Sequence, residues 1–143
     1  MHAGEEGPPA YVSQALDLGA ERIAHGVRSV QDPQLTARLV RERIPLTVCP
    51  LSNVRLGVFG AIEQHNLPRL LELGVLVTIN SDDPAYFGGY IGANYAAVRA
   101  AGLSDSALVQ LAKNSFIASF LARLDKQRCI AAIDAAAART LGA

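Results

Sequence analysis

One stretch constrains the fold of this chain more than any other: residues 78–84, with the sequence TINSDDP. An apolar, β-branched run from Val75 to Ile79 predicts a buried strand that leads directly into two neighbouring carboxylates. Pro84 then ends the strand and fixes the loop that follows. Adjacent residues of an extended chain point to opposite sides, so Asp82 and Asp83 can serve two different partners. A metal or hydrogen-bond donors would offset the cost of two such anions beside an apolar strand, whereas a polar Asp-Asp-Pro turn is the plainer alternative.

The arrangement of a short apolar strand followed by a helix recurs along the chain. Strands are predicted near residues 22–25, 45–49 and 75–80. Helical periodicity is found before the first of these strands, in 10–18, and between the strands, in 33–43 and 66–73. Such alternation is typical of βαβ units in a parallel sheet. The side chains that suggest chemistry all follow or end a predicted strand: His2, His25, Cys49, Asp82 and Asp83.

The carboxyl ends of the strands form the catalytic face of a TIM (β/α)8 barrel. The competing architecture, an open doubly wound sheet, more often shows a G-x-G-x-x-G turn, and the sequence contains none. A complete barrel needs about 250 residues, whereas this chain has 143 and strand ends for four units. We therefore expect a single α/β domain over residues 1–143, the C-terminal half of a TIM (β/α)8 barrel with parallel strands and extra C-terminal helices.

The segments outside these strands and helices are assigned from their turn residues and periodicity. Residues 51–55 are predicted to form a polar loop, and residues 86–90 an aromatic, Gly-rich loop. A helix follows to about Ala101, and Ser104 is expected to cap another that runs to about Phe120. The last helix should begin near Asp125 and fray into the Ala-rich tail.

Composition narrows the possible partners. Lys and Arg together number 13, as do Asp and Glu, so the net charge is zero with His neutral. This balance argues against nucleic acid or an anionic membrane as the main partner. Two Cys do not make a disulfide framework, no apolar run reaches the roughly 18 residues of a membrane span, and the opening MHAGEEGPP does not resemble a signal peptide. A cytoplasmic protein is therefore expected.

Four short motifs together resemble one enzyme family. HAGE (2–5), ERIAHG (21–26), PLTVCPLSNVRL (45–56) and TINSDDPAYFGGY (78–90) are similar to the adenosine/adenine deaminases, which are zinc hydrolases with (β/α)8 barrels. The sequences of the last two motifs look most like those of the adenine deaminase branch. The resemblance implies hydrolytic deamination of adenine to hypoxanthine and ammonia in the complete enzyme. Adenosine or another 6-aminopurine remains an alternative substrate, and a non-catalytic truncated half barrel is the alternative of a different class.

The resemblance also implies a role for each residue of the motifs. His2 matches a histidine that binds zinc, and Asp82 matches a carboxylate ligand that also faces the metal-bound water, whose pKa zinc lowers. His25 matches the histidine that orients or deprotonates this water. Glu5 matches the acid that protonates ring N1, and Asp83 matches the residue that hydrogen-bonds N7 of the purine. The motif further suggests that Asn80 and Ser81 support the Asp pair.

The remaining Cys and His side chains determine how many zinc ligands the chain can supply. Cys49 is expected to be a small buried residue rather than a zinc ligand, and His65, which matches no catalytic position, is expected at the surface. The family carries a His-x-His pair on its first barrel strand, whereas the three His of this chain, at 2, 25 and 65, include no such pair. His2 and Asp82 alone are fewer than the three or four protein ligands of ordinary zinc sites. A complementing barrel half, or a homo-oligomer, is therefore a possible partner.

Overall fold

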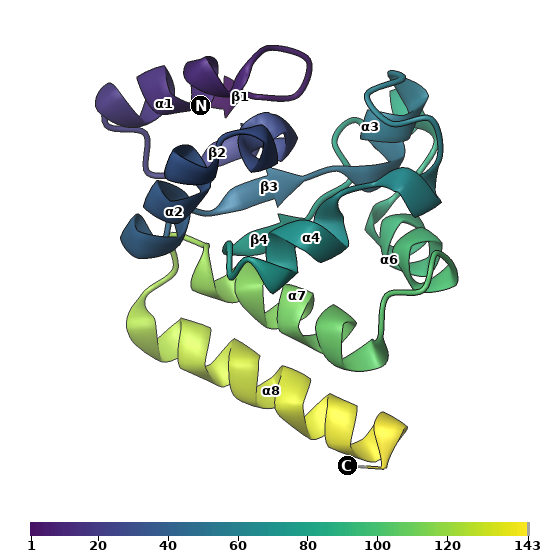
Figure 1. The fold of residues 1–143 in the computed structure, drawn as a ribbon. Helices are drawn as coiled ribbons and strands as arrows, with labels where there is room; N and C mark the ends of the chain where they lie inside the picture. The colour runs from purple at the N-terminus through teal and green to yellow at the C-terminus, as the bar shows by residue number, and fades with distance from the viewer. Residues whose placement is uncertain (143) are drawn as a thin grey trace.

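A computed structural model describes residues 1–142 and contains a parallel sheet whose strands lie side by side in chain order (Figure 1). These strands are β1 (His2–Ala3), β2 (Ile23–His25), β3 (Leu46–Val48) and β4 (Val77–Ile79). Each neighbouring pair is parallel, and Leu46 is in register with Val77. The predicted parallel strands are thus confirmed, which brings their carboxyl ends to one edge of the sheet.

Helical segments separate the strands and follow the last one. The α-helices are α1 (Pro9–Asp17), α2 (Pro33–Glu42), α3 (Pro50–Arg55), α4 (Leu67–Glu72), α5 (Pro84–Phe87), α6 (Ile91–Ala100), α7 (Asp105–Ile117) and α8 (Arg123–Leu141). Two 3-10 helices complete the set: η1 (Val27–Gln31) and η2 (Ile62–Gln64). Among the described residues, we find no helix long and apolar enough to cross a membrane.

Local capping signals explain where several helices begin. Asp32 precedes α2, and its Oδ1 accepts from the backbone N–H groups of Gln34 and Leu35 at 2.9 and 3.1 Å. Ser104 caps α7, as predicted, since its Oγ accepts from the N–H of Ala107. The helix ends at Ile117, slightly before the predicted end.

Two predicted loops contain helices instead. The segment expected to be a polar loop at 51–55 lies within α3, and Pro84, expected to fix a loop, is the first residue of α5. Both helices have proline in their first turn, where the missing N–H is no loss and the fixed φ already suits a helix. The fixed φ that led us to expect a strand end and a loop at Pro84 also favours helix initiation.

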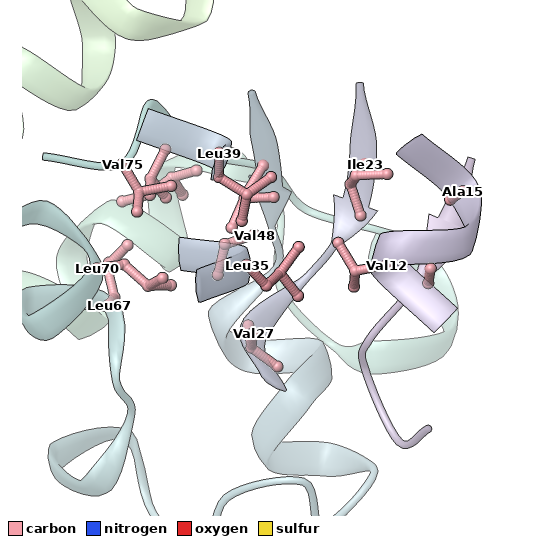
Figure 2. Packing of buried hydrophobic residues seen from close by; sticks show 14 of the residues in the cluster. Val12, Ala15, Ile23, Val27, Leu35, Leu39, Val48, Leu67, Leu70 and Val75 are labelled. Carbon is pink, nitrogen blue, oxygen red and sulfur yellow. The ribbon is translucent and has the colours of Figure 1, made fainter. Parts of the chain in front are cut away.

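The hydrophobic core lies between the sheet and the helices that follow its strands. Figure 2 shows Leu35 and Leu39 of α2 between Leu67 and Leu70 of α4 on one side and Val12 and Ile23 on the other. All six side chains are buried. Burying one such side chain contributes roughly 1.5–3 kcal/mol, so this contact surface holds the strand ends in place.

The C-terminal helices extend the fold beyond the last strand. Asn114 of α7 is buried, and its Nδ2 donates to the backbone oxygen of Val77 at 2.8 Å, which ties this helix to β4. Figure 1 shows α8 lying along the outer side of α7. No residue of α8 is buried, so it covers α7 without entering the core.

Candidate active site

The predicted site residues meet at the carboxyl edge of the sheet. Glu5 follows β1, His25 is the last residue of β2, Cys49 follows β3, and Asp82 follows β4. The structure brings their side chains together with that of His2 in two groups that share His25. The donor atoms of His2, Glu5 and His25 lie within 4.8 Å of one another, and so do those of His25, Cys49 and Asp82. Segments 80 residues apart in the chain therefore contribute to one site.

Glu5 lies at the centre of the hydrogen-bond network and is only 7% exposed. Its Oε1 accepts from Asn53 Nδ2 at 2.6 Å and lies 3.2 Å from His25 Nδ1. Its Oε2 lies 3.2 Å from Nε2 of His2, whose side chain is 65% exposed. One carboxyl oxygen is thus held by buried groups, whereas the other faces the open side of the site.

His25 is a buried imidazole between two acidic side chains. Burial lowers its pKa below the usual value, and His2 lowers it further, while Glu5 and Asp82 oppose this change. Its Nε2 lies 4.0 Å from Asp82 Oδ2. The ring is therefore neutral near pH 7 and can accept a proton.

Asp82 depends on α3 for its position. Its φ is +59°, a left-handed conformation uncommon for a residue with a side chain. The hydroxyl of Ser52, buried in α3, donates to Asp82 Oδ2 at 2.6 Å. Asn80 instead donates to Thr78 Oγ1, and Ser81 Oγ donates to the backbone oxygen of Asp82. Of the two residues expected to support the Asp pair, Ser81 therefore contacts the Asp82 backbone and Asn80 bonds to Thr78, whereas Ser52 holds the Asp82 side chain.

Asp83 has a different partner from Asp82, as predicted, although β4 ends at Ile79 and the left-handed Asp82 rather than strand alternation separates the two side chains. It precedes α5, and its Oδ1 accepts from the N–H of Tyr86 at 3.0 Å. The side chain is exposed. It thus lies beside Asp82 in sequence but outside the buried network of Glu5 and His25.

His65 was expected at the surface, and this expectation was wrong: the residue is only 5% exposed. Its Nδ1 accepts from the N–H of Leu67 at 3.0 Å, and its Nε2 lies 3.2 Å from Asn53 Oδ1. Its ring packs against that of Phe59 in a tilted arrangement, with centroids 4.3 Å apart. Burial lowers the pKa of His65 to about 4. The sequence signal that could have found it is the Asn66-Leu67-Pro68 helix start, which needs a capping acceptor.

Asn53 and Ser52 were also missed as site residues, although both lie in the CPLSNVRL motif. Both side chains are fully buried, which is unusual for polar residues and requires partners. Assigning their segment to a loop concealed the pattern, because α3 brings both side chains toward the site. Asn53 then links the Glu5 carboxyl to His65.

The side chains at this edge of the sheet carry donor atoms that suit a metal ion. Imidazole nitrogens and carboxylate oxygens, as found at His2, His25, Glu5 and Asp82, are the ligand types that a catalytic zinc uses. Cys49 Sγ lies beside His25 and Asp82, and burial, with the nearby charges of Asp82 and Glu5, raises the pKa of its thiol to about 12. It is buried, as predicted, and remains protonated near pH 7.

The sequence matches known deaminases along most of its length. The family model described as "Adenosine deaminase" matches residues 1–136. An adenine deaminase of Streptomyces coelicolor is 65% identical over 122 residues, which cover 84% of this chain and 36% of the relative. An adenine deaminase of Hahella chejuensis is 56% identical over 135 residues, covering 93% and 40%. The chain thus spans about two fifths of the length of these curated relatives.

Solved structures give the same result for the fold. The adenine deaminase from Arthrobacter aurescens superimposes with a TM-score of 0.90 at 46% identity, covering 93% of this chain and 41% of that one. A cog1816 amidohydrolase from Burkholderia ambifaria, with bound Zn, has a TM-score of 0.84 at 25% identity, covering 93% and 38%. Arabidopsis ADAL complexed with IMP has a TM-score of 0.81 at 27% identity, covering 96% and 40%. The predicted half of a TIM barrel is confirmed by these partial matches.

Proposed function

This chain belongs to the adenosine deaminase family, and on that premise we propose that residues 1–143 form the C-terminal domain of a cytoplasmic, zinc-dependent adenine deaminase. The complete enzyme would convert adenine and water to hypoxanthine and ammonia. The observation that carries the proposal is the convergence of Glu5, His25 and Asp82 at one sheet edge. The names of the most similar relatives support adenine as the substrate.

We propose His2 and Asp82 as the zinc ligands that this chain supplies. Catalytic zinc sites have three protein ligands as a rule, so further ligands would come from a segment outside these residues or from a complementing barrel half. Bound zinc would lower the pKa of a water molecule so that hydroxide is available near neutral pH. Ser52 would hold the Asp82 carboxylate in the orientation that a ligand needs, through the 2.6 Å hydrogen bond already described.

The remaining residues would move protons and orient the purine. His25, a neutral base beside Asp82, would accept a proton from the water that attacks C6. Glu5, with Oε2 on the open side, would donate a proton to ring N1. The C6–N bond then breaks as the amino group accepts the proton held by His25 and leaves as ammonia, while the proton of the new C6 hydroxyl returns to Glu5.

The Asp83 carboxylate would hydrogen-bond the N7 edge of the purine. Both a free base and a nucleoside present this edge, so Asp83 does not distinguish them, and the names of the most similar relatives favour the free base. A 6-aminopurine nucleotide is the second candidate substrate, because Arabidopsis ADAL, a structural relative, was crystallised with IMP.

Two variants of the complete enzyme test the assigned roles. Glu5→Gln and Asp82→Ala should both abolish adenine hydrolysis, for different reasons. Glu5→Gln removes the proton donor and should retain zinc, whereas Asp82→Ala removes a ligand and should weaken zinc binding. Metal analysis of the purified proteins distinguishes the two effects. Equal loss of zinc from both variants would contradict the separate roles.

A further inference from the structure

His65 and Asn53 form a buried chain of hydrogen bonds that ends on the Glu5 carboxyl. The chain runs from the Leu67 N–H to His65 Nδ1, from His65 Nε2 to Asn53 Oδ1, and from Asn53 Nδ2 to Glu5 Oε1. The three links are 3.0, 3.2 and 2.6 Å long. His65 itself lies on the far side of Asn53 from Glu5, so it acts on the site only through this amide.

The direction of each hydrogen bond follows from the backbone N–H at the start of the chain. A backbone N–H can only donate, so His65 Nδ1 must be an acceptor and carry no proton. The burial that lowers the pKa of His65 to about 4 keeps the ring neutral, and its single proton is therefore on Nε2. Nε2–H donates to Asn53, and the oxygen of the amide must face His65.

This arrangement removes the usual ambiguity of an asparagine side chain. A carboxamide can rotate by half a turn and exchange its oxygen and nitrogen at little steric cost. Here the Nε2–H of His65 needs an acceptor, so it permits only the orientation in which Asn53 Oδ1 faces the ring and Nδ2 faces Glu5. In the opposite orientation, Asn53 Oδ1 would face Glu5 Oε1, and two acceptors at that short distance repel when Glu5 is ionised.

We propose that His65 is a positioning residue for the reaction: its Nε2–H fixes the Asn53 amide so that Nδ2 donates to Glu5 Oε1 and the carboxyl presents Oε2 to the substrate. This inference rests on the proposed function for its kinetic consequence, but the orientation itself does not depend on it. The competing explanation is that His65 only caps α4 and fills space against Phe59.

Two amide substitutions separate these explanations, because each keeps a different half of the imidazole. In His65→Asn, the side-chain oxygen lies near the place of Nδ1 and can still accept from Leu67, but nothing reaches Asn53. In His65→Gln, the longer amide can place a donor near Nε2 and still reach Asn53, but the cap of α4 is lost. Both variants lack the ring that packs against Phe59, so they are matched in packing.

Activity and stability should therefore change in opposite order in the two variants of the complete enzyme. We expect kcat for adenine to fall roughly 10- to 100-fold in His65→Asn, with KM within about threefold, because His65 touches neither substrate nor metal. The kcat of His65→Gln should be about tenfold higher than that of His65→Asn. His65→Gln should nevertheless melt at a lower temperature than His65→Asn, because it lacks the cap of α4. If kcat follows the melting temperature instead, His65 has only a structural role and the proposal is wrong.

A double-variant cycle tests whether the effect passes through Asn53. His65→Asn introduced on an Asn53→Ala background should lower kcat by less than about twofold, because the amide through which it acts is already gone. A further loss as large as in the wild-type background would show that His65 acts by another route and would overturn the proposal.

The tautomer of His65 can be measured without any variant. In the complete enzyme labelled with 15N-histidine, the resonances of His65, assigned through contact with the Phe59 ring, should show the neutral Nε2–H form at neutral pH. An Nδ1–H form or a charged ring would overturn the proposal even if both variants failed to fold. If the wild-type enzyme deaminated no 6-aminopurine, the proposed function would fail, whereas this spectrum would still decide the orientation of Asn53.

Discussion

Replacing Ser52 with alanine removes one hydroxyl from beneath the site and leaves the side-chain volume almost unchanged. Ser52 is fully buried in α3, and its Oγ donates to Asp82 Oδ2 at 2.6 Å. The Asp82 side chain is 30% exposed and its backbone is in the left-handed region. The hydroxyl is therefore a principal restraint on a carboxylate that the backbone alone would leave free to rotate.

The magnitude follows from the partial exposure of Asp82. A hydrogen bond to a charged acceptor contributes about 1.5–3 kcal/mol when its partner is buried. Water can replace part of this bond at a side chain that is about a third exposed, so we take the lower end, about 1.5 kcal/mol, which corresponds to roughly tenfold in an equilibrium constant. If Asp82 is a zinc ligand, Ser52→Ala should therefore raise the zinc dissociation constant of the complete enzyme roughly tenfold.

A chelator-competition titration of the complete enzyme measures this change. Ser119→Ala is the matched control, because Ser119 Oγ donates at 2.7 Å to the backbone oxygen of Phe116, beyond the end of α7 and away from the site. The control should bind zinc as the wild type does. A zinc affinity of Ser52→Ala within about twofold of the wild type would refute the reasoning that Ser52 orients a metal ligand.

Three other outcomes are expected. The complete enzyme should deaminate adenine with kcat/KM well above that for adenosine, and comparable values in a steady-state assay would contradict the preference for the free base. At pH 8, iodoacetamide should label the half-buried Cys129 faster than Cys49, whose pKa is raised to about 12; equal labelling, read by mass spectrometry, would show that the thiol of Cys49 is not shielded. Burial lowers the pKa of His65 from 6.5 to about 4, so between these values the unfolded chain holds a proton on this ring that the folded chain does not. The free energy of unfolding should therefore fall as the pH falls through this window, by up to about 3 kcal/mol. His65→Asn should lack this contribution to the pH dependence measured by urea unfolding. Identical pH profiles of the variant and the wild type would contradict the prediction.

The sequence by itself determined the strand-and-helix pattern and the predicted placement of the site residues at strand ends. Apolar runs such as 75–79 and the cap of α2 at Asp32 are local signals, since periodicity and capping involve residues within one or two turns of each other. A parallel sheet then requires the carboxyl ends of its strands to share an edge. His25 and Asp82 could therefore be expected together before their distance was known.

Only the tertiary structure decided which polar side chains support that site. His65 and Glu5 are joined through Asn53, and these contacts connect segments up to 48 positions apart. The local helix start at Leu67 indicates that His65 can accept a backbone N–H, but it does not show that the ring is buried, because burial depends on which segments pack over it. The hydrogen bond from Ser52 to Asp82 likewise depends on packing, because it forms only when α3 lies near the end of β4. Side chains at strand ends follow from local periodicity, whereas the hydrogen bonds that orient them follow from packing between distant segments.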